Sequence, residues 1–290
     1  MTAGLRYPYA SARDRPASTA PALLPERHLD APLLLPLVAL AAAVGAAMNA
    51  VAGGGTLVTF PALVALGVPM VTANATSTVA LWPGTMTSLW GYRAELRGAR
   101  RWAVAFAVPS FVGGIIGALL LLVTPERRFA AIVPWLILGA TTLFLAQGPL
   151  LRRFRESAPA RAIEDADGSL RPPSVPFLVY QLLVGVYGGY FGAGAGILML
   201  AALGLMGLTN IHQMNGLKNW GGGVMNLVAV VIFAASGIVD WPIALAMAGG
   251  ATLGGVGGSL MAQRVGQTWV RRAIVVIGLG SGLAMLFGLL

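Results

Sequence analysis

Two glycine-rich breaks, one in each half of the chain, contain the residue types best suited to bind a ligand. The segments VAGGGT (51–56) and FGAGAG (191–196) each follow a long apolar stretch and precede a short one. The start of a helix exposes backbone N–H groups and a partial positive charge, and glycine lets an anion approach the backbone closely. The breaks therefore predict an anion site, with close helix packing as the alternative use of glycine in membrane helices.

Lys218 is the only lysine and stands in MNGLKNWGGG, where a second long apolar stretch begins. An unpaired charge in a membrane helix costs about 2.5–3.5 kcal/mol, and no acidic residue lies nearby in the sequence. Lys218 is therefore either a snorkelling lysine at a helix end or a positive charge that faces an anionic substrate. His212 can titrate near neutral pH, and it is the candidate for proton coupling.

Uncharged hydrogen-bonding side chains gather near the breaks, where they could bind a substrate, bridge helices or cap them. Asn74 and Asn215 are favoured because they align when the two halves of the chain are compared. The predicted substrate-binding residues are Asn49, Gly53, Gly54, Gly55, Thr56, Asn74, Thr76, Ser77, Gly192, Gly194, Gly196, Asn215, Lys218 and Asn219.

The residues that most enzymes need are missing from the apolar segments. All ten Asp and Glu residues fall in tails, loops or predicted helix ends, so no carboxylate is placed mid-membrane for a proton relay or Na⁺ coupling. Neither HExxH nor GxSxG occurs, and the absence of cysteine removes thiolate metal sites and Cys nucleophiles. We expect no enzymatic activity, no bound metal and no cofactor.

The composition is that of a membrane protein. Of the 290 residues 57% are hydrophobic and only 10% are charged, against about 25% charged in soluble domains. A soluble enzyme, a nucleic-acid-binding protein and a disordered regulator are all disfavoured. The net charge of +9 comes from arginines in short loops and tails, which is how membrane proteins mark their cytoplasmic side. The expected partners are the lipid bilayer and a small anion, with a homodimer as a further candidate.

The chain divides into four parts. We predict a polar N-terminal tail (1–31), a first transmembrane repeat (32–150), a cytoplasmic linker (151–175) and a second transmembrane repeat (176–290). At a shift of 140 residues Gly54 falls on Gly194, and after one inserted residue Asn74 falls on Asn215. Because the two halves align along their length with a single gap, the sequence predicts a duplication.

Each repeat is expected to contain the same series of helices. The predicted segments are 33–52, 56–67, 74–92, 102–123 and 129–150, then 176–191, 197–207, 216–236, 241–262 and 270–290. A dozen residues give about 18 Å of helix against a core of about 30 Å, so 56–67 and 197–207 predict a re-entrant or broken hairpin. Three spanning helices complete each repeat, and an odd number of crossings inverts the second repeat. The fold class predicted is an all-α, polytopic helical membrane protein with two inverted repeats.

A family resemblance rests on the segments just described. GAAMNAVAGGGTLVTFPALVALGV and GVYGGYFGAGAGILMLAALGLMGL, with the following ANATST and MNGLKN and the pairs Gly113-Gly114 and Gly254-Gly255, resemble the TauE/SafE-type sulfite exporter family. Its members are also described as toluene-sulfonate uptake permeases (TSUP) or probable membrane transporter proteins. The resemblance covers residues 36–290. One departure is that Pro61 fits the family pattern, whereas Ala201 stands at the matching place in the second half.

The resemblance implies a multi-pass permease of the bacterial inner membrane that moves sulfite or an organosulfonate. Alternating access between the two repeats is the mechanism expected for inverted repeats with broken helices. Two other readings stay open at this point. The same donors could line an anion channel, or the protein could be a membrane scaffold without transport. The missing carboxylates disfavour a cation transporter.

Overall fold

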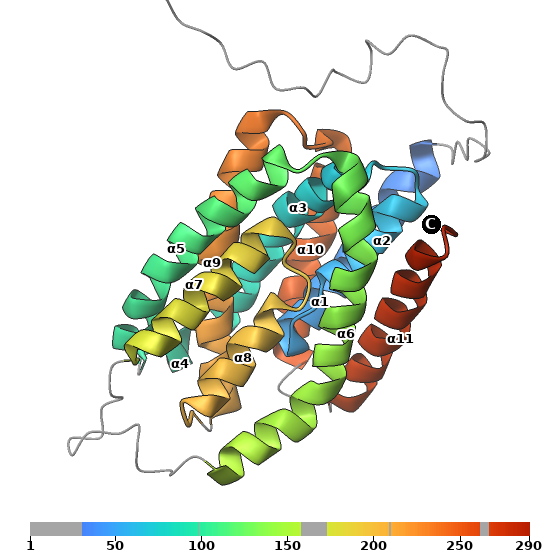
Figure 1. Ribbon diagram of the computed structural model, residues 1–290. Coiled ribbons are helices and arrows are strands. Elements are labelled where there is room, and N and C mark those ends of the chain that lie inside the picture. The colour runs from blue at the N-terminus through green and yellow to red at the C-terminus, as the bar shows by residue number, and fades with distance from the viewer. Residues whose placement is uncertain (1–30, 98, 158–172, 209, 262–266) are drawn as a thin grey trace, which may run out of the picture.

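The fold is built from helices alone within the part of the chain that the structure describes (Figure 1). This computed structural model describes residues 31–97, 99–157, 173–208, 210–261 and 267–290. The helices are α1 (Ala31–Ala52), α2 (Thr56–Ala65), α3 (Met70–Gly91), α4 (Arg93–Arg97), α5 (Arg100–Val123), α6 (Glu126–Ser157), α7 (Val175–Tyr190), α8 (Ala195–Leu205), α9 (Ile211–Ser236), α10 (Trp241–Met261) and α11 (Gln267–Leu286).

Both predicted helix breaks are confirmed. Helix α1 ends at Ala52 and α7 ends at Tyr190, directly before the two glycine-rich segments. The backbone φ is +75° at Gly53, +128° at Gly54, +79° at Gly192 and +80° at Gly194. Residues that carry a Cβ atom rarely adopt a backbone conformation in this left-handed region. Glycine therefore allows the chain to leave one helix and start the next within a few residues.

The short helices α2 and α8 also end in the same way. Gly67 and Gly207, which correspond at a shift of 140 residues, have φ values of +83° and +89°. In both turns the residue after the glycine donates its N–H to a carbonyl five residues earlier, at 3.1 Å. This is the hydrogen bond of a Schellman motif, so the two hairpins share their backbone geometry from the break to the final turn.

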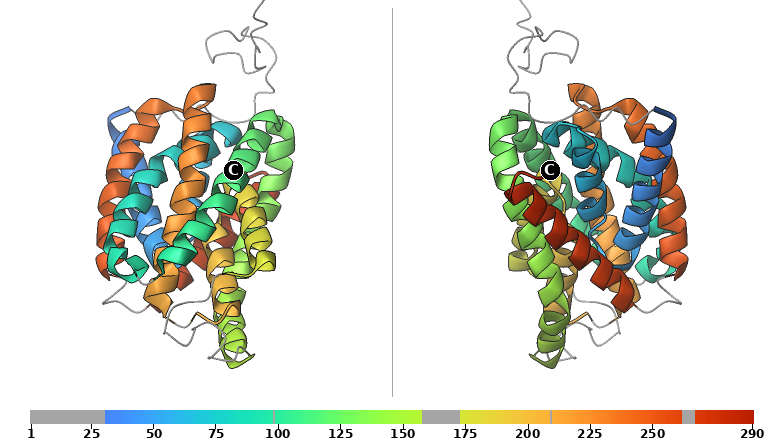
Figure 2. Two further views of the ribbon diagram at one scale, coloured as in Figure 1. Left: turned by 90° about the vertical axis from the view of Figure 1, so that its left-hand side faces the viewer. Right: turned by 90° about the vertical axis from the view of Figure 1, so that its right-hand side faces the viewer.

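The two hairpins enter the bundle from opposite ends as drawn in Figure 1, and their turns meet inside it. Helix α1 runs down from the upper end and α2 returns towards it, whereas α7 and α8 enter from below. The turns are in contact, because a Cβ atom on Gly53 would lie 3.3 Å from the Cα atom of Gly196. Helix α1 packs on α10, α7 packs on α5, and α3 packs on α9 (Figure 2).

Glycines on α5 and α10 allow this packing to be close. A Cβ atom on Gly117 would lie 2.1 Å from the carbonyl oxygen of Val186 in α7, and one on Gly254 would lie 2.0 Å from that of Ala43 in α1. Neither position can hold a side chain without moving a helix. The glycine pairs Gly113-Gly114 of α5 and Gly254-Gly255 of α10 are thus packing residues.

Five described helices are long and apolar enough to cross a membrane. These segments are Leu33–Ala50, Arg100–Val123, Glu126–Ala146, Ile211–Ser236 and Trp241–Leu260. Helix α6 continues through Ser157, seven residues into the segment expected to be linker, and α4 was not expected. The N-terminal tail lies outside the described residues, as do residues 158–172 of the linker.

Candidate functional site

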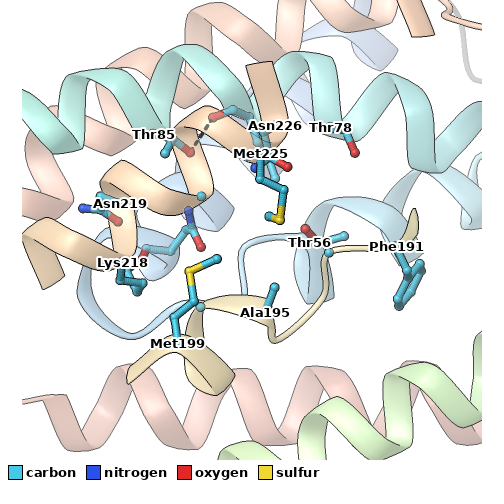
Figure 3. A pocket seen from close by; sticks show the side chains of 15 residues that line it. Thr56, Thr78, Thr85, Phe191, Ala195, Met199, Lys218, Asn219, Met225 and Asn226 are labelled. Carbon is cyan, nitrogen blue, oxygen red and sulfur yellow. Dashed lines mark hydrogen bonds between the residues drawn. The ribbon is translucent and has the colours of Figure 1, made fainter. Parts of the chain in front are cut away.

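A small cavity lies between the two turns and helices α3 and α9 (Figure 3). Its volume is about 50 Å³, and about 10–15 Å³ is enough for one water. The cavity can therefore hold a small oxyanion or a few waters. Its lining residues are Asn49, Thr56, Thr78, Leu81, Thr85, Phe191, Gly192, Ala195, Gly196, Met199, Lys218, Asn219, Gly222, Met225 and Asn226.

The lining residues of α3 and α9 stand at positions that align when the two halves of the chain are compared. The lining positions on α3 are 78, 81 and 85, and those on α9 include 219, 222 and 226, each pair separated by 141 residues. Spacings of three and seven residues place side chains on one face of a helix. The cavity thus lies where equivalent faces of the two halves meet.

Two residues at the starts of the short helices line the cavity and, among the described residues, have unpaired backbone amides. Thr56 opens α2, Gly196 is the second residue of α8, and the two positions correspond at a shift of 140. Within the described chain neither amide has a hydrogen-bond acceptor, as is usual in the first turn of a helix. The amides of Gly53 and Gly54 are occupied, since they donate to Asn49 O at 3.1 Å and to Asn49 Oδ1 at 3.3 Å.

Lys218 supplies a positive charge to this cavity. Its side chain is 3% exposed, its Nζ donates to Asn49 O at 2.9 Å, and its stem packs on Gly196. The ammonium has three N–H donors, so two remain. A snorkelling lysine would instead reach the membrane surface.

No carboxylate is paired with Lys218 among the residues that the structure describes. The Glu126 carboxylate accepts from the amides of Met70 and Val71 at the start of α3, and Asp240 Oδ1 accepts from Ile243 N at the start of α10. Both acids therefore cap helices elsewhere. A buried charge without a partner is costly, so the site lacks a negative charge that a bound anion would supply.

The side chains of α9 and α3 differ in what they offer the cavity. The Asn219 Nδ2 group is buried without a hydrogen-bond partner, and no bond is found for the Asn226 amide in the described part of the chain. In contrast, the hydroxyls of Thr78 and Thr85 donate to carbonyls one turn earlier in α3, at 2.9 and 3.2 Å. Free N–H donors therefore come from α9, while the hydroxyl hydrogens of α3 are already used.

Apolar side chains complete the lining. Met199 and Met225 project into the cavity between its Lys218 and Phe191 ends (Figure 3). Phe191 is held edge-on by Phe60 and Phe129, with ring centroids 5.4 and 6.0 Å away. The cavity thus combines a cationic, donor-rich end with flexible thioethers and an aromatic ring.

The structure brings part of the predicted site together. The predicted residues that line the cavity are Asn49, Thr56, Gly192, Gly196, Lys218 and Asn219. Of the predicted turn glycines, Gly53, Gly54 and Gly55 shape the first turn without lining the cavity, and Gly194 lines a different cavity.

Four predicted polar residues do not line the cavity, and three of them bond elsewhere. Asn74 Nδ2 donates to Tyr190 O at 2.9 Å, and Thr76 Oγ1 accepts from the Asp240 amide at 3.0 Å. Ser77 Oγ lies 2.6 Å from Thr59 Oγ1. The fourth, Asn215, is buried one turn before Asn219 with an unpartnered Oδ1. Asn74 and Ser77 therefore hold the hairpins in place.

His212 lies at the start of α9 and does not line the cavity. Its amide donates to Asn210 Oδ1 at 3.0 Å, and its ring centroid is 6.4 Å from that of Tyr92. Burial, and then the Glu95 carboxylate, raise the pKa of Tyr92, so this neighbour stays uncharged near neutral pH. Proton coupling through His212 stays a prediction.

Sequence reasoning missed Thr85, Asn226, Met199 and Met225. The repeat register could have found two of them, because Thr85 and Asn226 lie seven residues after the equivalent pair Thr78 and Asn219. The methionines carry no such signal. No group of three or more His, Asp or Glu side chains placed to hold a metal occurs within the described ranges.

Comparisons with known proteins agree with this architecture. The family model for the sulfite exporter TauE/SafE matches residues 37–285. A probable membrane transporter protein of Haemophilus influenzae is 29% identical over 79% of this chain and 86% of its own length. A probable membrane transporter protein, ORF9, of a Sinorhizobium species is 27% identical over 87% and 92%. The probable membrane transporter protein YfcA of Escherichia coli K12 is 28% identical over 85% and 87%.

Proposed function

The chain belongs to the sulfite exporter TauE/SafE family, and we propose that this multi-pass membrane transporter moves a small sulfur-containing anion, sulfite or an organosulfonate, across the bacterial inner membrane. The family description names sulfite, and the relatives named above are described only as probable membrane transporters. The substrate class therefore has to be supported by the chemistry of the cavity itself.

The observation that carries the proposal is a buried lysine with no carboxylate partner in the described chain. Lys218 Nζ retains two donors, and the same space is lined by Asn219, whose Nδ2 group has no partner, and by Thr56 and Gly196, whose amides have no acceptor in the described chain. Charge-assisted hydrogen bonds of this kind are about twice as strong as neutral ones. A tetrahedral or pyramidal oxyanion presents several acceptor oxygens and can replace its hydration shell with these groups.

The apolar lining supports an anion that carries an organic group. Met199, Met225 and Phe191 offer no strong donor, and methionine adapts its shape to irregular ligands. A sulfonate could direct its oxygens to Lys218 and its carbon substituent to the methionines. Sulfate, which has oxygens on all sides, would leave some of them facing apolar groups.

Alternating access fits the position of the cavity between two hairpins. The turns meet at Gly53 and Gly196, so rocking one half against the other would open the cavity to one end of the bundle at a time. Because Asp and Glu do not line the cavity, we favour uniport, anion exchange or weak proton coupling over Na⁺ symport.

The experiment is an uptake screen with purified protein in liposomes. Sulfite, thiosulfate, sulfoacetate, taurine and sulfate would be tested with and without a pH gradient, against protein-free liposomes. We expect saturable uptake of sulfite or sulfoacetate above the control, and weaker uptake of taurine because it carries no net charge and its ammonium would lie among the apolar methionines. Absence of uptake of every anion by correctly reconstituted protein would contradict the proposal.

Two leucine variants, one at the cavity and one away from it, serve as the second control of that screen. Gly196→Leu fills the space beside the Lys218 stem, whereas Gly249→Leu adds the same side chain to α10 at a position with open space around its Cβ. We expect uptake to be lost only in Gly196→Leu. Currents through single open pores, instead of saturable uptake, would indicate an anion channel, and uptake unaffected by Gly196→Leu would place the transport path elsewhere.

A further inference from the structure

A second cavity shares the second turn as a wall with the anion cavity. Its volume is about 200 Å³. Ala193 and Gly194 line it, while their neighbours Gly192 and Ala195 line the anion cavity. Its other wall is the face of α6 that runs from Trp135 to Leu143. We name this second cavity the alkyl crevice.

The alkyl crevice is lined by groups that suit hydrocarbon. Apart from the Trp135 indole, its only polar side chain is Tyr187, and that hydroxyl donates to Ala193 O at 2.5 Å. Gly139 also lines it, and a Cβ atom there would meet nothing within 4 Å. Apolar cavities of this size stay dry and bind apolar molecules. A polar ligand would find few free hydrogen-bonding partners.

The crevice adjoins the lipid-facing surface at mid-membrane depth. Trp135 is 63% exposed and lies near the middle of the candidate span Glu126–Ala146. In a membrane, the medium around an exposed side chain at this depth is the hydrocarbon of the lipid tails. An alkyl chain is therefore the molecule that can reach the crevice.

We propose that the alkyl crevice binds one acyl chain of a membrane phospholipid and that the bound chain restrains the second turn. The turn rests on α6 through a bare glycine, since a Cβ atom on Gly194 would lie 3.0 Å from Ala140 Cβ. A chain packed beside it contacts the back of the segment whose front lines the anion cavity. The restraint rests on the proposed function, because it slows transport only if the turn moves during transport.

The test fills the crevice from within. Gly139→Leu places a side chain in the open space, and Gly280→Leu is its matched control, because Gly280 is the equivalent residue of α11 and its Cβ is equally free. Both would be reconstituted with a phosphatidylcholine whose acyl chain carries a mid-chain diazirine, irradiated and mapped by mass spectrometry. We expect labelling of residues 135–143 and 193–198 in the wild type and in Gly280→Leu, and its loss in Gly139→Leu.

Two results of this labelling would overturn the proposal. One is labelling of the crevice no stronger than that of the exposed face of α10 around Leu253, which is 75% exposed. The other is equal labelling in the two leucine variants.

The restraint on the turn has a readout that does not depend on transport. The chain contains no cysteine, so Ala195→Cys provides a single thiol on the cavity side of the turn. We expect a methanethiosulfonate reagent to modify it about fivefold faster when Gly139→Leu is added, because the acyl chain that restrains the turn is expelled, with no change when Gly280→Leu is added. Equal rates in both would overturn the restraint. Sulfite uptake should rise in parallel, and a wild type without uptake would contradict the proposed function while leaving the labelling and the thiol modification as valid tests of this proposal.

Discussion

Helices α3 and α9 face one cavity from equivalent positions, yet they present different chemistry to it. On α9 the cavity is lined by Lys218, Asn219 and Asn226, and the Asn219 Nδ2 group has no hydrogen-bond partner in the part of the chain that the structure describes. On α3 it meets Thr78 and Thr85, whose hydroxyls donate to their own helix. The position equivalent to Lys218 is Ser77, which bonds to Thr59 and does not line the cavity.

The contrast separates what the two halves of the chain share from what distinguishes them. The two halves share two hairpins, two helix starts and two matched helix faces. Neutral copies of these parts would bind an anion weakly, because helix N-termini and hydroxyls carry only partial charges. The full charge stands on α9 alone, so a bound anion would be held mainly by the second half.

Replacing Lys218 would have the largest effect on this contrast. Lys218→Met keeps the stem that packs on Gly196 but removes the charge. We expect the affinity for sulfite to fall about 100-fold, as when one partner of a buried charge pair is removed. The measurement is titration calorimetry in detergent, together with uptake into liposomes.

The equivalent residue of α3 is the matched control for that substitution. Ser77→Ala removes the hydroxyl that lies 2.6 Å from Thr59 Oγ1, which should lower stability modestly without changing anion affinity. If Ser77→Ala weakened sulfite binding as much as Lys218→Met, the two walls would be equivalent in function and the contrast would fail.

Asn219→Leu should change affinity and stability in opposite directions. Asn219 Nδ2 is buried without a partner, and an apolar group of similar shape removes that desolvation cost. We expect the ligand-free protein to melt at a higher temperature, while sulfite affinity falls about 20-fold because a hydrogen bond to a charged group is lost. A lower melting temperature would assign Asn219 a structural role instead.

The sequence carries enough information to predict most of this fold. Long apolar segments, two clusters of glycine and a register held by one gap predict the helices, the breaks and the pairing of the halves. The reason is physical, since a membrane helix must satisfy its own backbone and only glycine tolerates the positive φ found at Gly53 and Gly194. The short helix α4 has no such signal and was not predicted.

The site is less predictable, because polar residues near a break have several uses. Asn49, Thr56 and Lys218 line the cavity, whereas Asn74 and Thr76 bond to the backbone of other helices. All five have polar side chains that can donate hydrogen bonds. They lie either beside the first break or in the segments ANATST and MNGLKN that follow the short helices. Only the three-dimensional packing decides which of them meets the cavity and which joins two helices.

Gly196→Ala would test whether the contact between the turns matters as much as the charge. An added Cβ lies 3.2 Å from Lys218 Cδ and 3.4 Å from Gly53 Cα, so the turns or the lysine stem must shift. Overpacking of this kind costs about 1–3 kcal/mol, and we expect sulfite uptake to fall about tenfold. Gly249→Ala, where the Cβ has open space, should transport normally, and equal uptake by both variants would remove the turn contact from the mechanism.

The smallest effect is expected at Asn226 of α9 and at Thr85 of α3, the last residue of each helix that lines the cavity. Asn226→Leu removes an amide with free donors, whereas Thr85→Val removes a hydroxyl whose hydrogen is already donated to Leu81 O at 3.2 Å. One neutral hydrogen bond corresponds to about fivefold in affinity, so we expect that loss of sulfite affinity in Asn226→Leu and less than half of it in Thr85→Val. Equal losses, measured by the same calorimetric titration, would mean that α3 contributes donors after all. The difference between α3 and α9 would then rest on Lys218 and Asn219.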